Sequence, residues 1–244
     1  YIPAINDVFP SKKIKRVKVS SKTSKLCGKF RKGHFNGVVT VLKSLFDQVS
    51  PNLGFFGEKD FQQILIIKDL ISEYKLKIKI ITIPTVRDNT GLAYSSRNNL
   101  LNNKQKKIAS FLFKTIKEIS FEAKKNPNKL NSLKIIGKKK LINYGFNKID
   151  YLEIYNENNL SKENIKKNNL RVFVAASLGK TRLIDNYKNW NDYWTYIWTS
   201  GTTTSPLVLA VKATFFEGNP KLTKLLNTLS AYFFTLEELI LVSP

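Results

Sequence analysis

The chain has 244 residues, of which 42% are hydrophobic and 12% aromatic, and it carries a formal net charge of +23. This length and hydrophobic content suffice for the core of one large domain or two small ones, and the aromatic share argues against a disordered chain. The single cysteine, Cys27, excludes an intrachain disulfide and a zinc site built on cysteine pairs, and is typical of a reducing compartment.

The positive charge has two interpretations. Lysine and arginine can neutralise the phosphates of a nucleic acid and release counterions. Here, however, the lysines are scattered and accompany many Asn and Ile residues, as a drift toward AT-rich codons would produce, and no interleaving of aromatic and basic residues stands out. We therefore favour compositional drift and expect no nucleic-acid partner.

The ends of the chain and its apolar stretches bear on location and completeness. We find no signal peptide and no apolar stretch of the roughly 18 residues that a spanning helix needs, so we expect no membrane partner. The sequence contains no methionine. Because an intact reading frame begins with methionine, we expect a fragment or a processed product.

The first half of the sequence alternates between helical and strand patterns. Apolar spacing predicts a helix over 38–49, a buried strand over 53–56 and a second helix over 61–74. A β-branched run over 77–83 that ends at a proline predicts another strand. Strand, helix and strand in this order predict a βαβ unit with parallel strands and a right-handed crossover.

Further along the chain, the pattern changes to helices followed by strands. Helices are predicted over 108–119 and 130–144, and strands over 149–155, 170–176 and 180–184, the last two as a hairpin. This order is typical of a small α+β domain.

Composition divides the chain into three segments. We place one junction near Val86, between residues 1–86 and 87–188. After Lys188 the charge balance turns slightly acidic, with three lysines against four acidic residues, and Thr and Trp become frequent. We therefore expect residues 189–244 to form a separate tail, in which apolar spacing predicts an amphipathic helix over 222–240.

Two polar motifs follow the two predicted parallel strands. Residues 57–60 follow the first strand, and residues 85–88 follow the second and lead into residues 91–98. In an open parallel sheet, ligands bind beyond the carboxyl ends of the strands. Both motifs are therefore expected to face one crevice.

Their residue types suit a nucleoside triphosphate. Gly57 allows close backbone approach, and a helix amino terminus beginning at Asp60 offers N–H groups to anions. Lys59 supplies a positive charge, and Asp60 can accept hydrogen bonds from ribose. Donors for a leaving pyrophosphate are provided by Ser95, Ser96 and Arg97. Each motif also has an ordinary interpretation, as a polar turn or as the cap of the following helix.

Three motifs together resemble a known family. Residues 32–38 (KGHFNGV), 56–63 (FGEKDFQQ) and 91–98 (GLAYSSRN) resemble successive signatures of pantothenate synthetases. Residues 174–176 and 181–186 (TRLIDN) resemble the closing strands of that family. The likeness covers roughly residues 1–187 and stops before the tail, which resembles nothing in the family.

The resemblance implies a fold and a reaction. The fold is α/β, with a partial Rossmann-like nucleotidyltransferase domain at residues 1–86 and a small α+β domain at 87–188. The reaction is an ATP-dependent ligation of pantoate with β-alanine through pantoyl adenylate. The family likeness further implies ATP and Mg²⁺, a homodimer and a cytoplasmic location.

Site residues follow from the matching motifs. The implied ATP site consists of Gly57, Glu58, Lys59, Asp60, Val86, Tyr94, Ser95, Ser96 and Arg97. Within it Lys59 contacts phosphate, Asp60 the ribose, and Val86 the adenine through its backbone. Gln63 is implied to hold pantoate, and Arg31 is a second implied pantoate-binding residue at the border of the pocket. The candidate catalytic residues are Lys59, Arg97 and His34, although a local packing role for His34 is equally open. No metal ligand is implied among these residues.

The sequence departs from the family pattern in two ways. Tyr94 stands where relatives usually carry Met or Leu. The His-x-Gly-His signature of the family, with its second glutamine and magnesium-binding carboxylates, has no match. We therefore expect an amino-terminal truncation, an exposed strand and loop at residues 1–10, and no turnover by this chain alone.

The alternative functions are a basic nucleic-acid-binding module on a synthetase-like scaffold and a non-functional relic. The tail is either sequence read through after a lost stop codon or an interaction segment.

Overall fold

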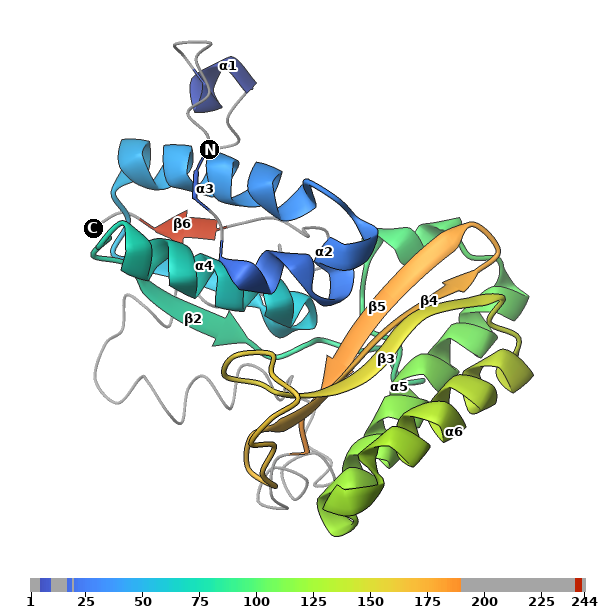
Figure 1. Cartoon of the computed structure of the whole chain (residues 1–244). Coiled ribbons are helices and arrows are strands. Elements are labelled where there is room, and N and C mark those ends of the chain that lie inside the picture. The colour runs from blue at the N-terminus through green and yellow to red at the C-terminus, as the bar shows by residue number, and fades with distance from the viewer. Residues whose placement is uncertain (1–4, 10–16, 19, 190–239, 243–244) are drawn as a thin grey trace, which may run out of the picture. The chain divides into compact units, whose positions relative to one another are not determined.

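A computed structural model describes residues 5–9, 17–18, 20–189 and 240–242 of the chain (Figure 1). Residues 1–188 and 239–244 belong to one compact unit, and residues 189–238 to a second. All helices and strands named below belong to the first unit. The predicted tail helix falls outside the described residues except at its last position.

The amino-terminal half of the chain contains a pair of parallel strands. β1 (Leu53–Gly57) and β2 (Lys79–Ile83) pair in parallel along their whole length, and α4 (Phe61–Glu73) connects them. The predicted strands, helix and parallel pairing are confirmed. The other edge of β1 carries β6 (Ile240–Val242) in antiparallel pairing, so the helical prediction is wrong at Ile240.

Helices precede this strand pair in the chain. α1 (Ile5–Val8), the short 3-10 helix η1 (Ser21–Ser24) and α2 (Leu26–Phe30) come first. The strand and loop expected at residues 1–10 are wrong at Ile5–Val8, which form α1, and residues 1–4 and 10 lie outside the described part.

The predicted helix over 38–49 is longer in the structure. α3 (His34–Val49) begins four residues earlier, after Gly33, whose φ of +78° lies in the left-handed region that favours glycine. Apolar side chains one helical turn apart, at Val39, Leu42 and Phe46, turn its buried face toward the core.

The second sheet is antiparallel, with the order β3-β4-β5. Its strands are β3 (Lys148–Asn156), β4 (Leu170–Leu178) and β5 (Thr181–Tyr187). The turn between β4 and β5 contains Gly179 at a φ of +57°, and the predicted hairpin is confirmed. A register irregularity in β3 lies between Ile149 and Tyr151.

Two antiparallel helices lie along one face of this sheet (Figure 1). α5 (Asn103–Lys125) starts with a capping box in which the Asn102 side chain accepts from Gln105 N and the Gln105 side chain accepts from Asn102 N. α6 (Leu130–Tyr144) follows after a short turn and ends at Gly145, in the left-handed conformation. Both predicted helices are confirmed, and α5 extends beyond its predicted bounds at each end.

Alternate residues of β4 enter two different cores. Val172, Val174 and Ala176 pack with α5 and α6, whereas Phe173 and Ala175 pack with apolar side chains of α2, α3 and α4. Because successive strand residues point to opposite faces, the sheet is buried on both sides, which explains the continuous apolar run in β4. Packing thus continues across the junction predicted near Val86, and the division there stays a prediction. Within the described residues, no helix combines the length and apolar character needed to span a bilayer.

Candidate functional site

The first polar motif forms a tight turn after β1. Residues Glu58–Asp60 make the 3-10 helix η2, and α4 begins immediately afterwards at Phe61. Lys59 Nζ lies 3.7 Å from Asp60 Oδ2, with the lysine side chain 13% exposed and the aspartate 45% exposed. The turn therefore presents an accessible carboxylate beside a mostly buried ammonium group at the carboxyl end of a parallel strand.

The turn is anchored from the antiparallel sheet. The carboxylate of Glu58 pairs with the guanidinium of Arg171 on β4 at 2.9 Å. The side-chain amide of Asn186 on β5 donates to the backbone carbonyls of Glu58 and Lys59, both at 2.9 Å. We therefore assign the Glu58 side chain to holding the turn. The predicted role of Glu58 in ATP binding stays a prediction.

The second motif forms a closed loop after β2. Arg87 and Ala93 form an isolated antiparallel bridge, and Asp88 Oδ1 accepts hydrogen bonds from Thr90 N, Thr90 Oγ1 and Leu92 N. Gly91 has a φ of +90°, and a Cβ atom there would lie 2.9 Å from the Phe113 ring. Both conditions favour glycine at this position of the loop.

The loop leads into the 3-10 helix η3 (Ser96–Leu100). Ser95 caps it by accepting a hydrogen bond from Arg97 N at 3.2 Å, so the capping interpretation holds for this serine. Val86 O accepts from Tyr94 N at 3.1 Å, while the side chains of both residues are exposed. The half-buried guanidinium of Arg97 has no hydrogen-bond or ion-pair partner among the described residues.

The two loops converge on one strand. β5 contacts both η2 and η3. His34, at the start of α3, is close enough to Asp60, Arg97 and Arg182 for their charges to affect its pKa. The structure therefore brings together residues that lie up to 148 positions apart in the sequence, whereas their individual roles toward ATP remain predictions.

His34 is neutral and oriented by its neighbour. Burial lowers its pKa below the usual value, the guanidinium of Arg31 lowers it further, and Asp60 opposes the shift. Arg31 Nη1 lies 2.9 Å from His34 Nε2. Because a guanidinium can only donate, Nε2 accepts the bond, and the ring proton resides on Nδ1.

The two adjacent glutamines on α4 have different environments. Gln62 is buried, accepts from Cys27 N and donates to the carbonyls of Lys22 and Lys25. Gln63 is partly exposed, and its side chain has no hydrogen-bond partner in the described part of the chain. Gln62 thus holds the segment before α2 in place, and Gln63 is available to a ligand.

Sequence reasoning missed Arg182 as a neighbour of this site. Its Nε donates to Asp150 Oδ2 at 2.6 Å, and both terminal nitrogens lie 3.8 Å from the Sγ of Cys27. Cys27 Sγ is in turn 3.0 Å from the hydroxyl of Tyr151. The signal was present, since Arg182 belongs to the motif at residues 181–186 that was interpreted only as a closing strand.

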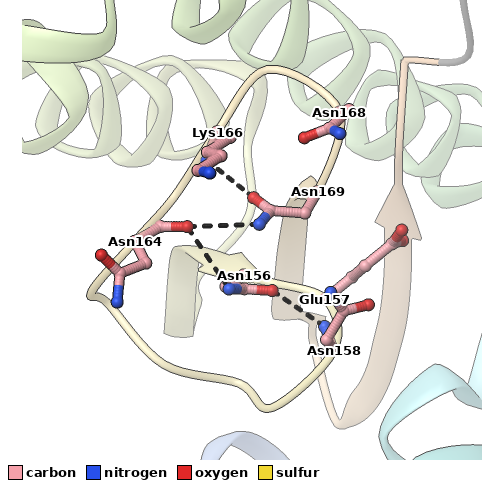
Figure 2. Close-up of a pocket in the computed structure, with 7 residues that line it drawn as sticks. All are labelled: Asn156, Glu157, Asn158, Asn164, Lys166, Asn168 and Asn169. Carbon is pink, nitrogen blue, oxygen red and sulfur yellow. Dashed lines mark hydrogen bonds between the residues drawn. The ribbon is translucent and has the colours of Figure 1, made fainter.

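A separate polar hollow of about 530 Å³ lies in the loop between β3 and β4. Asn156 and Asn169 both donate from their side chains to Asn164 O, and the same two side chains accept from Asn158 N and Lys166 N (Figure 2). These bonds join parts of one loop to each other. The hollow is therefore a consequence of the loop's own structure and contains none of the predicted site residues.

Metal binding needs a cluster of suitable side chains. No group of three or more His, Cys, Asp or Glu side chains in the described ranges is placed to hold a metal ion. No Mg²⁺ site is therefore assigned to the residues that the structure describes, and no chemical step below is routed through one.

The chain is similar to proteins of known name. A family model described as pantoate-beta-alanine ligase matches residues 1–188. A pantothenate synthetase of Buchnera aphidicola is 41% identical over 192 residues, covering 77% of this chain and 67% of the relative. One of Clostridium botulinum is 37% identical over 185 residues, covering 76% and 66%.

Solved structures give the same likeness. Pantothenate synthetase of Thermus thermophilus superimposes with a TM-score of 0.70 at 31% identity, covering 76% of this chain and 67% of that one. Pantoate-beta-alanine ligase of Francisella tularensis, complexed with beta-gamma ATP and beta-alanine, gives a TM-score of 0.58 at 33% identity, covering 75% and 61%. The chain thus spans about two thirds of the length of the Buchnera and Clostridium relatives.

Proposed function

Because this chain belongs to the pantoate–β-alanine ligase family, we propose that it forms the ATP-phosphate and pantoate side of a ligase that joins pantoate to β-alanine. The finer fold assignment, a partial Rossmann-like nucleotidyltransferase domain, is part of this proposal. So are the homodimer, the cytoplasmic location and the accompanying Mg²⁺. Mg²⁺ would supply charge neutralisation on the triphosphate, without a carboxylate site in the described residues.

One observation carries the proposal. Arg97 is a half-buried cation without a counter-charge among the described residues. Its charge affects the pKa of His34, as does that of Asp60, which lies beside Lys59 in the turn after β1. Since a cation that is partly removed from water is stabilised by a nearby counter-charge, a bound anion explains this arrangement better than a structural role does. A triphosphate supplies that anion, and a ribose hydroxyl can donate to the accessible Asp60.

The proposed reaction has two balanced steps. The carboxylate of pantoate attacks the α-phosphorus of ATP, forming pantoyl adenylate and releasing pyrophosphate. The amine of β-alanine then attacks the acyl carbon, the bond to AMP breaks, and the amine loses a proton. Lys59 and Arg97 stabilise the charge that builds on the leaving pyrophosphate.

The remaining residues bind and orient. Gln63, one helical turn beyond Asp60, holds pantoate through its side-chain amide. Val86 meets adenine through its backbone, and residues 94–96 close over the phosphates. Neutral His34, held by Arg31, borders the pantoate pocket and offers its Nδ1 proton to a carboxylate oxygen.

Nucleotide binding by the purified chain tests the proposal. We expect saturable ATP binding in calorimetry and a rise of the melting temperature with ATP concentration, because a ligand that binds only the folded state stabilises it. Pyrophosphate should compete. An absence of ATP binding, together with nucleic-acid affinity that falls steeply with salt, would instead support the nucleic-acid module.

A further inference from the structure

Two neighbouring residues of β5 each hold one of the candidate nucleotide loops. Asp185 Oδ2 and Oδ1 accept from Arg87 Nη1 and Nη2 at 2.7 and 2.9 Å, and Arg87 belongs to the loop that leads to η3. Asn186 donates to the carbonyls of Glu58 and Lys59 in the turn η2. Because adjacent strand residues point to opposite faces, one strand can reach both loops from its two sides.

Both anchors are buried and make specific polar contacts. Asp185 and Asn186 are each 4% exposed, and the Arg87 side chain is 10% exposed. The guanidinium of Arg87 also lies over the Phe113 ring, 3.6 Å from its centroid, and donates to Gly91 O. A bidentate pair of this kind fixes direction as well as distance.

A second layer orients Asn186. Its Oδ1 accepts from Arg171 Nη1 at 2.6 Å, which leaves the side-chain nitrogen facing the turn. Arg171 itself is 2% exposed, pairs with Glu58 and Glu157, and lies 3.8 Å from the centroid of the Phe61 ring. The amide of Asn186 therefore has one orientation, in which it donates to the turn.

We propose that Asp185 and Asn186 are positioning residues that set the distance between the Lys59 turn and the Arg97 loop across a bound ATP. This inference rests on the proposed function. The two residues touch neither the substrate nor the reacting atoms. Asp185 and Asn186 hold the two loops at fixed positions on β5, and only in these positions do the Lys59 ammonium and the Arg97 guanidinium reach the same phosphates. Misplacement of such groups weakens catalysis steeply.

The test uses two single variants of the full chain and one control. Asp185→Asn removes the charge that holds Arg87 and keeps the side-chain shape. Asn186→Ala removes the donor to the turn. Glu153→Gln, on β3 of the same sheet, is the control. It removes the charge that pairs with Lys134 of α6 at 3.1 Å and with Lys162 at 3.8 Å, and it touches neither loop.

Hydrogen–deuterium exchange gives a readout that does not depend on activity. We expect Asn186→Ala to speed exchange in residues 58–60 selectively, and Asp185→Asn to speed it in residues 87–97 selectively. A purely structural role predicts instead a lower melting temperature with faster exchange throughout the unit. Exchange unchanged in both loops would overturn the proposal, and the Asn186 variant decides it if the Asp185 variant does not fold.

Calorimetry with ATP gives the second readout. Since charge-assisted and buried hydrogen bonds hold the two loops, we expect each variant to weaken ATP binding about tenfold or more, measured below its melting temperature, with the control unchanged. Unchanged ATP affinity in both variants would overturn the positioning role. If the unmodified chain binds no ATP, the proposed function fails, whereas the exchange experiment still decides whether β5 holds the loops.

Discussion

The guanidinium of Arg31 lies 2.9 Å from Nε2 of His34, three residues further along the chain. A cation at this distance opposes protonation of the imidazole, and burial of the ring opposes it more strongly. Both residues belong to a region where Asp60, Arg97 and Arg182 also affect the ring. His34 therefore reports on the electrostatics of the whole candidate site.

The first prediction concerns the pKa of His34. Because this is the chain's single histidine, its ring resonances in NMR spectra need no assignment. We expect a pKa below the usual value of about 6.5, and an increase toward it in Arg31→Gln. Bound ATP should raise the pKa, since phosphates favour the charged ring. A pKa at or above the usual value in the free chain would contradict the structure.

The same shift has a consequence for stability. The folded ring binds a proton less readily than the unfolded ring, so the unfolded state gains more protons as the pH falls through about 6.5. Unfolding therefore becomes easier as the pH falls from neutrality. Chemical denaturation at several pH values measures this effect. Between neutral pH and the pH range below about 6.5, the free energy of unfolding should decrease less in His34→Gln than in the unmodified chain.

A second prediction separates the two glutamines of α4. Gln62→Ala removes one acceptor and two donated bonds in a buried position, and should lower the free energy of unfolding by about 2 kcal/mol or more. Gln63→Ala should leave stability nearly unchanged and weaken pantoate binding, with ATP binding unaffected. Calorimetry with each ligand checks this pair, and an equal loss of ATP affinity in Gln63→Ala would give that residue another role.

The sequence predicted the local elements well because their signals are local. Helical spacing predicted α3, α4, α5 and α6, and apolar or β-branched runs bounded by turn residues predicted the strands of the βαβ unit and the hairpin. The start of α3 was missed because residues 34–37 show no apolar periodicity, and its boundary depends on the conformation of Gly33.

The anchoring of the site was not predictable by the same means. Arg171 and Glu58 are separated by 113 positions, and Arg87 and Asp185 by 98. No periodic pattern relates residues so far apart. The motif at residues 56–63 pointed to Glu58 as a nucleotide ligand, whereas packing of the turn against β4 places its carboxylate on a buried arginine.

A third prediction concerns the two cations of the site. Arg97→Ala and Lys59→Ala should each weaken ATP binding by about tenfold or more, because a buried charge-assisted contact to phosphate is lost. Lys68→Ala is the matched control, since Lys68 is exposed on α4. Arg97→Ala should not reduce stability, as its guanidinium has no partner in the described part of the chain. ATP affinity equal to that of the control in both variants would exclude the phosphate assignment.

The last prediction concerns Arg171, whose guanidinium is buried between two carboxylates. Arg171→Met keeps much of the side-chain volume but leaves Glu58 and Glu157 without their shared partner. Removing one member of a buried ion pair typically costs about 3–5 kcal/mol, so we expect a loss of that order in denaturant unfolding. Glu157 keeps its pair with Lys188, so the larger share of the lost stability comes from the unpaired Glu58.

The double variant Arg171→Met, Glu58→Gln should recover part of the stability, because a neutral amide is less costly to leave unpaired than a charge. Recovery of stability without recovery of ATP affinity is the expected outcome, since the turn would be folded but no longer anchored to β4. A double variant no more stable than the single one would show that Arg171 stabilises the chain through contacts other than Glu58.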